Sequence, residues 1–588
     1  MRRDSFLKAT LLGAASLAGG ILSPIRGALS KEPQTELTMD HEQLQARNQN
    51  RSTVVSRNGM ACTAQPLASM AGIDILRRGG NAIDAAICAN ATLSVVEPMS
   101  CGPGGDLFAI VWIEKDRQLY GLNASGRSPY NWSLEDAQAM GLTAIPEFSP
   151  LSWSVPGCVS GWQALLDRFG TLDFKDVLET PIHHAREGFP VSPVIARSWS
   201  GIDAKQHPDG VEVNARLFPT FAPDGSAPRF GDIFRNPGIA DFFEIIAKGG
   251  GDEFYQGEIA GRIVRFSEAN GGRFTKRDFQ DHTVDWIDPV STNYRGYDVW
   301  ELPPNGQGIA TLQILNLLEH FDIGSLEPNS AEQLHLFIEA KKLAFEDRAV
   351  YYADMDFAPV PLQELISKSY AKERVKLINR KRAAGNVQPG MLNTKADTTY
   401  LTTADSEGNM VSLIQSTYYG FGSKYVPDGL GFALQNRGLL FALDPSHLNK
   451  LEPHKRPFHT IIPGFVTKDG VPTFAFGVMG GGFQPQGQAQ VLMNIIDYGM
   501  SVQQAGDRPR VAHYESSQPT GTRMEGPGMV IPERGISEKV LAKLARMGHH
   551  ISSGVGVHGG YQGIWRKDEP RRYFGASESR KDGVALGY

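Results

Sequence analysis

Hydrophobic residues recur at helical spacing near the start of the chain and at strand spacing further along it. The pattern predicts a helix over Met70–Arg78 and a second helix over Ala82–Val95, with Asn81 as the N-cap of the second. Because the second run is small and apolar on all sides, we expect that helix to be buried. A tight turn at 102–105 then precedes a predicted strand over Leu107–Trp112.

The middle of the chain, about 155–395, is predicted to be mainly helical. One helix begins at Ser330, with Gln333 at the spacing of a capping box. Its largely apolar face is predicted to contain Leu334, Phe337, Ile338, Lys341 and Phe345. Residues 380–397 are polar and lack periodicity, so we expect an exposed segment that leads into a new element.

That new element is a predicted hairpin. Residues Thr398–Ala404 are rich in β-branched side chains, Asp405–Asn409 form a turn, and Met410–Ser416 return as a second strand. A later hairpin turns at 468–470, and a helix is predicted over Gln488–Tyr498.

The first residues differ in composition from the rest. Arg2-Arg3 precede an apolar run, Ala9–Leu22, which is shorter than the roughly 20 residues that span a membrane. Residues 1–30 therefore predict an export signal, and a periplasmic or secreted protein. The paired arginines resemble a twin-arginine signal with one residue too many before Phe6, and an ordinary basic start for the general export route is the alternative. The polar residues 31–58 are expected to form a flexible arm.

Composition excludes some classes of function. The 588 residues are 41% hydrophobic and 21% charged, which is ordinary for a soluble globular protein. The net charge is −6 and no basic stripe is present, so we expect no nucleic-acid partner. No segment after the signal is long and apolar enough to predict a stable membrane span.

Cysteine and histidine spacing predicts no metal site and no cofactor. No CxxC pair occurs, and buried free thiols are expected, with one or two disulfides as the alternative in an exported protein, for Cys62, Cys88, Cys101 and Cys158. The pairs His183-His184 and His549-His550 come without an HExxH motif.

Thr398 is a candidate nucleophile. A hydroxyl needs a base, and a free α-amino group on the same residue can serve as one. That arrangement requires a cut between Asp397 and Thr398, at the junction of the polar segment and the strand. The alternative is that the threonine pair is present only because threonine favours strands.

A glycine triplet, residues 480–482, lies between a predicted strand and a predicted helix. Without Cβ atoms, its backbone N–H groups can approach a reacting carbonyl, and the helix N-terminus adds positive potential. These features indicate an oxyanion hole. A flexible turn or a phosphate-binding loop is the alternative, although the Lys-Ser/Thr of a P-loop is missing.

Many separate segments match γ-glutamyltransferases in order and spacing, and the chain resembles that family over nearly all of its length after residue 58. The matching segments are 59–60, 74–76, 79–86, 104–105, 155–157, 185–189, 253–255, 294–297, 347–348, 397–399, 408–409, 455–457, 463, 480–481 and 494–499.

The resemblance implies an αββα sandwich of the N-terminal-nucleophile hydrolases and self-cleavage of one precursor. The large subunit would be 59–397 and the small catalytic subunit 398–588, with a small-molecule amide as substrate and an acyl ester on Thr398. Ser416 stands where the family usually has a supporting threonine. Gly480 and Gly481 match the oxyanion pair.

The donor pocket departs from glutathione-cleaving members. Leu440 replaces the acidic residue that would bind the donor's α-ammonium, and Arg437 replaces an amide. A guanidinium there would repel an ammonium and bind a carboxylate, bidentately if geometry allows. A structural salt bridge is the alternative role for Arg437.

Other pocket positions also differ. The family's serine pair for the α-carboxylate is His459-Thr460 here, and its large-subunit arginine aligns with Ser125, two residues before Arg127. The amides Gln435 and Asn436 remain. This pocket resembles the branch that contains cephalosporin acylases and oxamate amidohydrolase, a resemblance supported by residues 458–463 and 484–487.

The sequence thus predicts an exported amidase or acyltransferase that takes a carboxylate-bearing acyl donor. A glutathione hydrolase with an altered pocket is one alternative. An exported, non-catalytic protein that never matures is the other.

Overall fold

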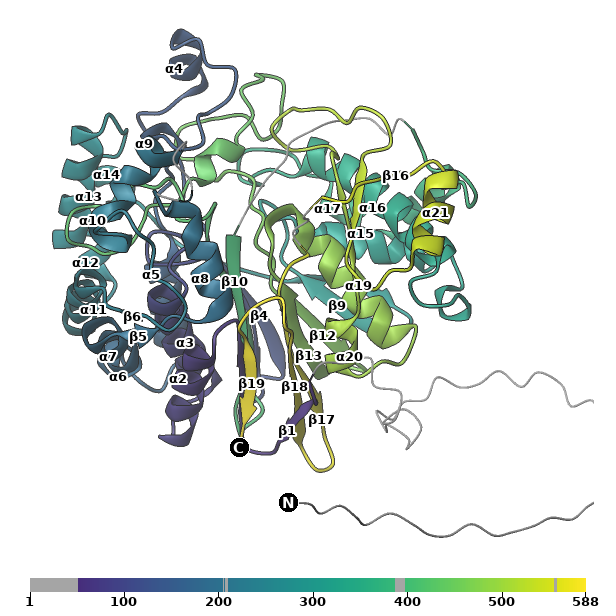
Figure 1. The fold of residues 1–588 in the computed structure, drawn as a ribbon, viewed down its shortest axis with the longest axis horizontal. Helices are drawn as coiled ribbons and strands as arrows, with labels where there is room; N and C mark the ends of the chain where they lie inside the picture. The colour runs from purple at the N-terminus through teal and green to yellow at the C-terminus, as the bar shows by residue number, and fades with distance from the viewer. Residues whose placement is uncertain (1–50, 205, 207–209, 386–396, 555–557) are drawn as a thin grey trace, which may run out of the picture. The chain divides into compact units, whose positions relative to one another are not determined.

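Two seven-stranded sheets pack face to face at the centre of the protein (Figure 1). The computed structural model describes residues 51–204, 206, 210–385, 397–554 and 558–588. The first sheet runs in the order β19 (Val584–Gly587), β2 (Met60–Thr63), β10 (Asp397–Ala404), β11 (Met410–Tyr418), β3 (Asp106–Ile113), β4 (Gln118–Ala124) and β7 (Asp285–Ile287). The second runs in the order β1 (Val54–Ser56), β18 (Arg572–Ser577), β17 (Tyr561–Lys567), β13 (Val471–Val478), β12 (Gly464–Lys468), β9 (Tyr297–Glu301) and β8 (Val290–Tyr294).

Helices cover the outer face of each sheet. Against the first sheet lie α2 (Pro66–Arg77), α3 (Ala82–Val96) and α5 (Cys158–Phe169), with α7 (Glu179–Glu187), α11 (Pro237–Gly249) and α13 (Glu258–Ala269) beyond them. Against the second lie α15 (Gly308–Leu318), α19 (Gln484–Ile496) and α20 (Val502–Asp507), with α16 (Ala331–Tyr351) packed on α15. Figure 1 shows the two groups of helices on opposite sides of the strands. The αββα sandwich and the mainly helical middle section are confirmed.

Side-chain alternation along β10 assigns each residue to one face of its sheet. Tyr400 lies in the core between the sheets, together with Phe108 and Phe465. Leu401 lies in the other core, between the first sheet and its helices. Because successive side chains on a strand point to opposite faces, Thr398 shares the inter-sheet side with Tyr400.

The turn between β10 and β11 is fixed by one carboxylate. Asp405 Oδ1 accepts hydrogen bonds from the backbone N–H groups of Glu407, Gly408 and Asn409 at 2.9–3.0 Å. Gly408 has φ of +107°, a conformation that favours glycine. Asp405 Oδ2 also accepts from Ala82 N at the start of α3. The hairpin is therefore anchored to the helix layer as well as to its own turn.

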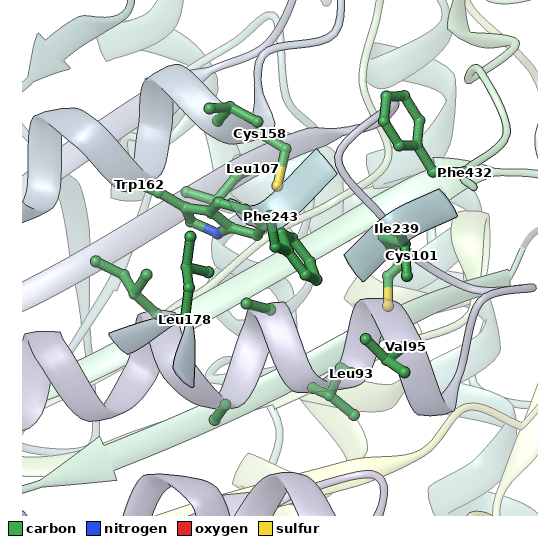
Figure 2. Close-up of a cluster of buried hydrophobic side chains, with 14 of the residues drawn as sticks. Leu93, Val95, Cys101, Leu107, Cys158, Trp162, Leu178, Ile239, Phe243 and Phe432 are labelled. Atoms are coloured by element: carbon green, nitrogen blue, oxygen red, sulfur yellow. The ribbon is translucent and has the colours of Figure 1, made fainter. Parts of the chain in front are cut away.

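The cysteines are free and buried, as expected from the sequence. Figure 2 shows the sulfur atoms of Cys101 and Cys158 inside an apolar cluster that includes Leu93, Val95 and Phe243. Burial raises the pKa of both thiols well above the usual value. These side chains are thus protonated core residues, and the disulfide alternative is wrong.

Several predicted boundaries need correction. The arm predicted over 31–58 is not wholly flexible, because β1 pairs with β18 at Val54–Ser56. Helix α2 begins before Met70, since Gln65 accepts a hydrogen bond from Leu67 N and acts as its N-cap. Helix α19 similarly begins before Gln488, at Gln484.

Other predictions stay untested or hold in part. The export signal (1–30), the arm up to residue 50 and the segment 386–396 lie outside the described residues. Within the described ranges, no helix combines the length and apolarity needed to cross a membrane. Ser330 caps α16 by accepting from Gln333 N, but the Gln333 side chain accepts from Asn329 N, so only half of the capping box forms.

Candidate active site

The predicted nucleophile lies at the buried start of β10. Thr398 is 1% exposed, and its Oγ1 donates a hydrogen bond to Ser416 Oγ at 3.3 Å. Ser416 Oγ in turn accepts from Tyr418 N at 2.8 Å. The structure therefore brings together Thr398 and Ser416, as the sequence predicted.

The register between β10 and β11 shifts by one residue beside the predicted cleavage point, because Ser416 and Thr417 of β11 both lie opposite Thr398 of β10. Asp397 pairs with Tyr418 and Thr399 pairs with Gln415, so the register shifts between these two pairs. A bulge leaves its extra residue outside the regular ladder and bends the strand locally. The extra residue belongs to β11, so the irregular stretch of the ladder is the one that carries Ser416, opposite Thr398.

The second threonine of the pair has a different partner. Thr399 Oγ1 donates to Glu97 Oε2 at 3.1 Å on the opposite face of β10. Glu97 is fully buried and also forms a salt bridge with Lys581 Nζ at 3.1 Å. Thr398 supplies the candidate nucleophile and Thr399 anchors the strand, which gives the Thr-Thr pair two separate roles.

The glycine triplet follows β13, which packs across the sheet interface on β10. A Cβ at Gly477 would lie 2.4 Å from the Tyr400 ring, so the two strands touch close to the nucleophile. Gly480 and Gly481 have φ of +119° and +55°, in the left-handed region that favours glycine. The triplet thus turns sharply into the 3-10 turn Gly481–Phe483 and helix α19.

Arg437 is a fully buried cation without a carboxylate partner among the described residues. Its Nη1 donates to Thr460 Oγ1 at 2.6 Å, and its guanidinium lies 4.4 Å from the centre of the Tyr418 ring. Its Nε and Nη2 have no hydrogen-bond partner. Burial lowers the pKa of Arg437 to about 10, so it stays charged at neutral pH. The salt-bridge alternative for this residue is wrong.

Arg437 is linked to the nucleophile through Tyr418. The Tyr418 ring lies beneath the guanidinium, and its backbone pairs with Asp397 and donates to Ser416. Tyr418 therefore contacts both Arg437 and the strand residue at the predicted cleavage point.

His459 and Gln435 both bind Asp106. His459 Nε2 is 3.0 Å from Asp106 Oδ2, and Gln435 Nε2 donates to Asp106 Oδ1 at 2.9 Å. His459 Nδ1 accepts from Ile461 N, which places the ring proton on Nε2. Burial, reinforced by Arg437, lowers the pKa of His459 to about 4, so the ring is neutral at pH 7. Asp106 therefore links His459 to Gln435.

The remaining predicted pocket residues divide into two groups. Thr460 contacts Arg437, and Asn436 accepts from Tyr419 N at 3.3 Å, so both lie at the site. Arg127 instead donates to Thr283 O at 3.2 Å and pairs with Asp285 at 3.8 Å. The structure does not bring Arg127 into contact with Arg437.

The gamma-glutamyltranspeptidase family model matches residues 68–588 of the chain. The chain belongs to this family. A glutathione hydrolase-like YwrD proenzyme from Bacillus subtilis is 37% identical over 548 residues, which are 91% of this chain and 99% of that protein. An oxamate amidohydrolase proenzyme from Klebsiella pneumoniae is 31% identical over 549 residues, 91% of this chain and 100% of that protein. A cephalosporin acylase structure from Bacillus halodurans matches with a TM-score of 0.84 and 40% identity, over 95% of this chain and 99% of that one.

The gamma-glutamyltranspeptidase-family site contains residues that sequence reasoning missed. Asp106, Glu97 and Gln307 carry no motif of their own, although Asp106 directly follows a matched glycine pair. The register of the sheet pairs Asp106 with Ser416, which brings it beside the nucleophile's partner. Such a pairing depends on the folded sheet and leaves no local signal in the sequence.

One histidine group away from this site has the composition of a metal site. His335, Glu339 and His549 place ligand atoms within 4.8 Å of one another. The atoms are already engaged, because His335 Nδ1 is hydrogen-bonded to His549 Nε2 at 2.8 Å and Glu339 forms a salt bridge with Lys342 at 2.8 Å. The group forms a buried hydrogen-bond cluster that the histidine pairs in the sequence did not reveal.

Proposed function

We propose that this chain is an amidase or acyltransferase that cleaves itself between Asp397 and Thr398 and then uses Thr398 as its nucleophile. In maturation, Thr398 Oγ attacks the Asp397 carbonyl carbon, the peptide C–N bond breaks, and the acyl group moves to oxygen. Water then hydrolyses the ester and leaves a free α-amino group on Thr398. The Ser416 contact and the shift in register opposite Thr398 support the proposal.

Turnover would use the same oxygen. Thr398 Oγ attacks the donor's amide carbonyl while its α-amine takes the hydroxyl proton, and that proton passes to the leaving amine as the C–N bond breaks. Backbone N–H groups at Gly480 and Gly481 would stabilise the oxyanion. Water or a second amine then attacks the acyl ester, which releases an acid or a new amide and returns the proton to Thr398.

The single observation that carries the donor class is the incomplete hydrogen bonding of Arg437. Nε and Nη2 lie on one edge of the planar guanidinium, and both lack partners in a fully buried position. A carboxylate can accept two parallel hydrogen bonds from that edge. We therefore propose an acyl donor with a terminal carboxylate, such as a glutaryl or oxamyl amide.

The surroundings of Arg437 argue against an α-ammonium on the donor. Leu440 is buried and uncharged, so it cannot form an ion pair with an ammonium group. The Asp106 carboxylate already accepts from Gly126 N, Gly157 N, Gln435 and His459. A donor ammonium beside Arg437 would gain a like charge without gaining a counter-ion. One relative, the oxamate amidohydrolase proenzyme, is named for a substrate that has a carboxylate and no α-ammonium.

The test compares matched glutaryl, γ-glutamyl and oxamyl anilides as donors for the purified protein. We expect kcat/KM for the glutaryl compound to exceed that for the γ-glutamyl compound by at least about tenfold, since 1.4 kcal/mol of discrimination suffices. A tenfold preference for the γ-glutamyl compound would instead establish a glutathione hydrolase. An uncut protein with no turnover of any donor would establish the non-catalytic alternative.

We also propose that the chain is exported, on the basis of residues 1–30. Mass spectrometry of the mature protein should find these residues missing. Replacing Arg2-Arg3 with Lys-Lys should block export if the twin-arginine route is used, and unimpaired export would indicate the general route. A full-length protein retained in the cytoplasm would contradict both.

A further inference from the structure

A buried amide joins the donor pocket to the glycine triplet. Gln307, in the loop between β9 and α15, is fully buried, and its Nε2 donates to Thr460 O at 2.6 Å and to Gly481 O at 2.8 Å. Both amide hydrogens are used, one on each loop. Gln307 therefore fixes the Gly481 carbonyl, which directly follows the proposed donor Gly481 N along the backbone, relative to Thr460, the residue that contacts Arg437.

The orientation of this amide is set by a buried arginine on α16. Arg348 Nη1 donates to Gln307 Oε1 at 2.7 Å, so the Gln307 oxygen must face the arginine and its nitrogen must face the two carbonyls. Arg348 Nη2 donates to Ser517 O and Gln518 Oε1. With these contacts, Arg348 connects the Gln307 amide to the loop that follows β14 (Val511–Tyr514).

Arg348 also places positive charge beside the triplet. A Cβ at Gly482 would lie 3.6 Å from Arg348 Nη1. The guanidinium lies 3.9 Å from the centre of the Phe345 ring and is fully buried. Burial lowers the pKa of Arg348 to about 9, which leaves it charged at neutral pH. A fixed cation in a water-poor site interacts strongly with charge that develops nearby.

We propose that Gln307 and Arg348 are positioning residues for the oxyanion hole: they fix the backbone of the glycine triplet and supply its neighbouring positive charge. The proposal rests on the proposed amidase function. Both residues belong to the predicted large subunit, whereas Gly481, Thr460 and Ser517 belong to the small one. The large subunit would thus shape the catalytic loop of the small subunit.

This role makes a specific kinetic prediction. The Gln307 amide hydrogens are already bonded within the protein, so Gln307→Met should disturb the transition state more than donor binding. We expect kcat for a glutaryl anilide to fall about tenfold to a hundredfold, below the 10²–10³-fold typical of losing an oxyanion donor outright. KM should stay within about twofold of wild type. Arg348→Lys should retain more activity than Arg348→Met, because it keeps the charge.

A transition-state analogue separates positioning from general damage. In 4-boronobutanoic acid, boron replaces the scissile carbonyl carbon of a glutaryl donor and can form a tetrahedral adduct with Thr398. Gln307→Met should weaken binding of this compound by the same factor as kcat, while the affinity for glutarate, the product, stays unchanged. The matched control is Gln313→Met, because Gln313 is also a buried amide and is bonded to Asp347 and Tyr352. It should leave kcat unchanged.

Three outcomes decide the matter. Equal losses of boronate and glutarate affinity in Gln307→Met, or a change in kcat of less than about twofold, would overturn the proposal while the amidase function stands. A wild-type enzyme inactive on every donor would overturn the amidase function, and this inference with it. If Gln307→Met fails to fold, as judged by thermal unfolding, Gln307→Asn provides the same comparison.

Discussion

Thr398→Ala should yield a single uncut chain with no measurable amidase activity. Without the hydroxyl, no oxygen is available to attack the Asp397 carbonyl, and without the cut no α-amine is released to act as base. Intact-mass spectrometry should find two pieces in the wild type, the smaller beginning at Thr398. In a serine protease, loss of the nucleophile reduces kcat by about 10⁶-fold. A single uncut wild-type chain that still hydrolyses amides would contradict the mechanism.

Thr399→Val is the matched control for this experiment. It keeps the β-branched shape in the strand and removes only the hydroxyl that donates to Glu97. We expect cleavage still to occur, with a loss of stability of about 1–3 kcal/mol from leaving a buried Glu97 oxygen without that donor. If Thr399→Val also abolishes cleavage, the Thr399 hydroxyl takes part in maturation, and a purely structural role for it is wrong.

Arg437→Met should reduce activity without reducing stability. The loss of a buried partner for the donor carboxylate typically costs about 3 kcal/mol or more, which corresponds to a fall in kcat/KM for the glutaryl anilide of roughly 10²-fold. The free protein, however, no longer buries a guanidinium whose Nε and Nη2 lack partners. Thermal unfolding of the variant should therefore occur at or above the wild-type temperature.

The stability measurement distinguishes a donor-binding role for Arg437 from a structural one. If Arg437 only supported the fold, the variant would lose activity and stability together. Arg127→Met is the comparison, because Arg127 is paired with Asp285 and bonded to Thr283. It should keep the donor preference of the wild type. A loss of glutaryl selectivity in Arg127→Met, with none in Arg437→Met, would move the donor carboxylate to Arg127.

A double substitution tests whether the donor preference can be shifted toward γ-glutamyl compounds. Arg437→Gln with Leu440→Asp removes the cation and adds the carboxylate that the resemblance places at position 440 in glutathione-cleaving members. The ratio of kcat/KM for the γ-glutamyl and glutaryl anilides should then shift toward the γ-glutamyl compound. An unchanged ratio would mean that neither residue contacts the donor's far end.

The sequence predicted best what lies in contiguous segments. Thr398, the hairpin that follows it and the glycine triplet are each local patterns, and the αββα sandwich followed from the resemblance that these segments carry. The single threonine-rich strand could not reveal that Thr399 binds Glu97, since the two residues are far apart in the chain. Gln307 was missed for the same reason, because its contacts with Thr460 and Gly481 exist only after folding.

Boundaries failed where a distant partner decides them. Strand β1 has three residues, too few for a clear alternating pattern, and it forms because β18 offers an edge to pair with. Helix α2 starts early because Gln65 replaces the usual capping residue and Pro66 suits a first turn. The sequence likewise could not predict that Arg437 is fully buried, since arginine is seldom fully buried.

The order of strands in the first sheet has a consequence for biosynthesis. Strand β2 lies between β19 and β10, and β11 pairs with β3, so strands from before and after Thr398 are interleaved in one hydrogen-bonded sheet. Neither product of a cut at Thr398 could complete this sheet alone, and two separate chains would have to associate before the sheet could form. The uncut chain makes that encounter intramolecular, at a high effective concentration. The peptide bond at Asp397 would thus hold the two segments together during folding. Its cleavage would be tolerated only after the strands on both sides of it have paired.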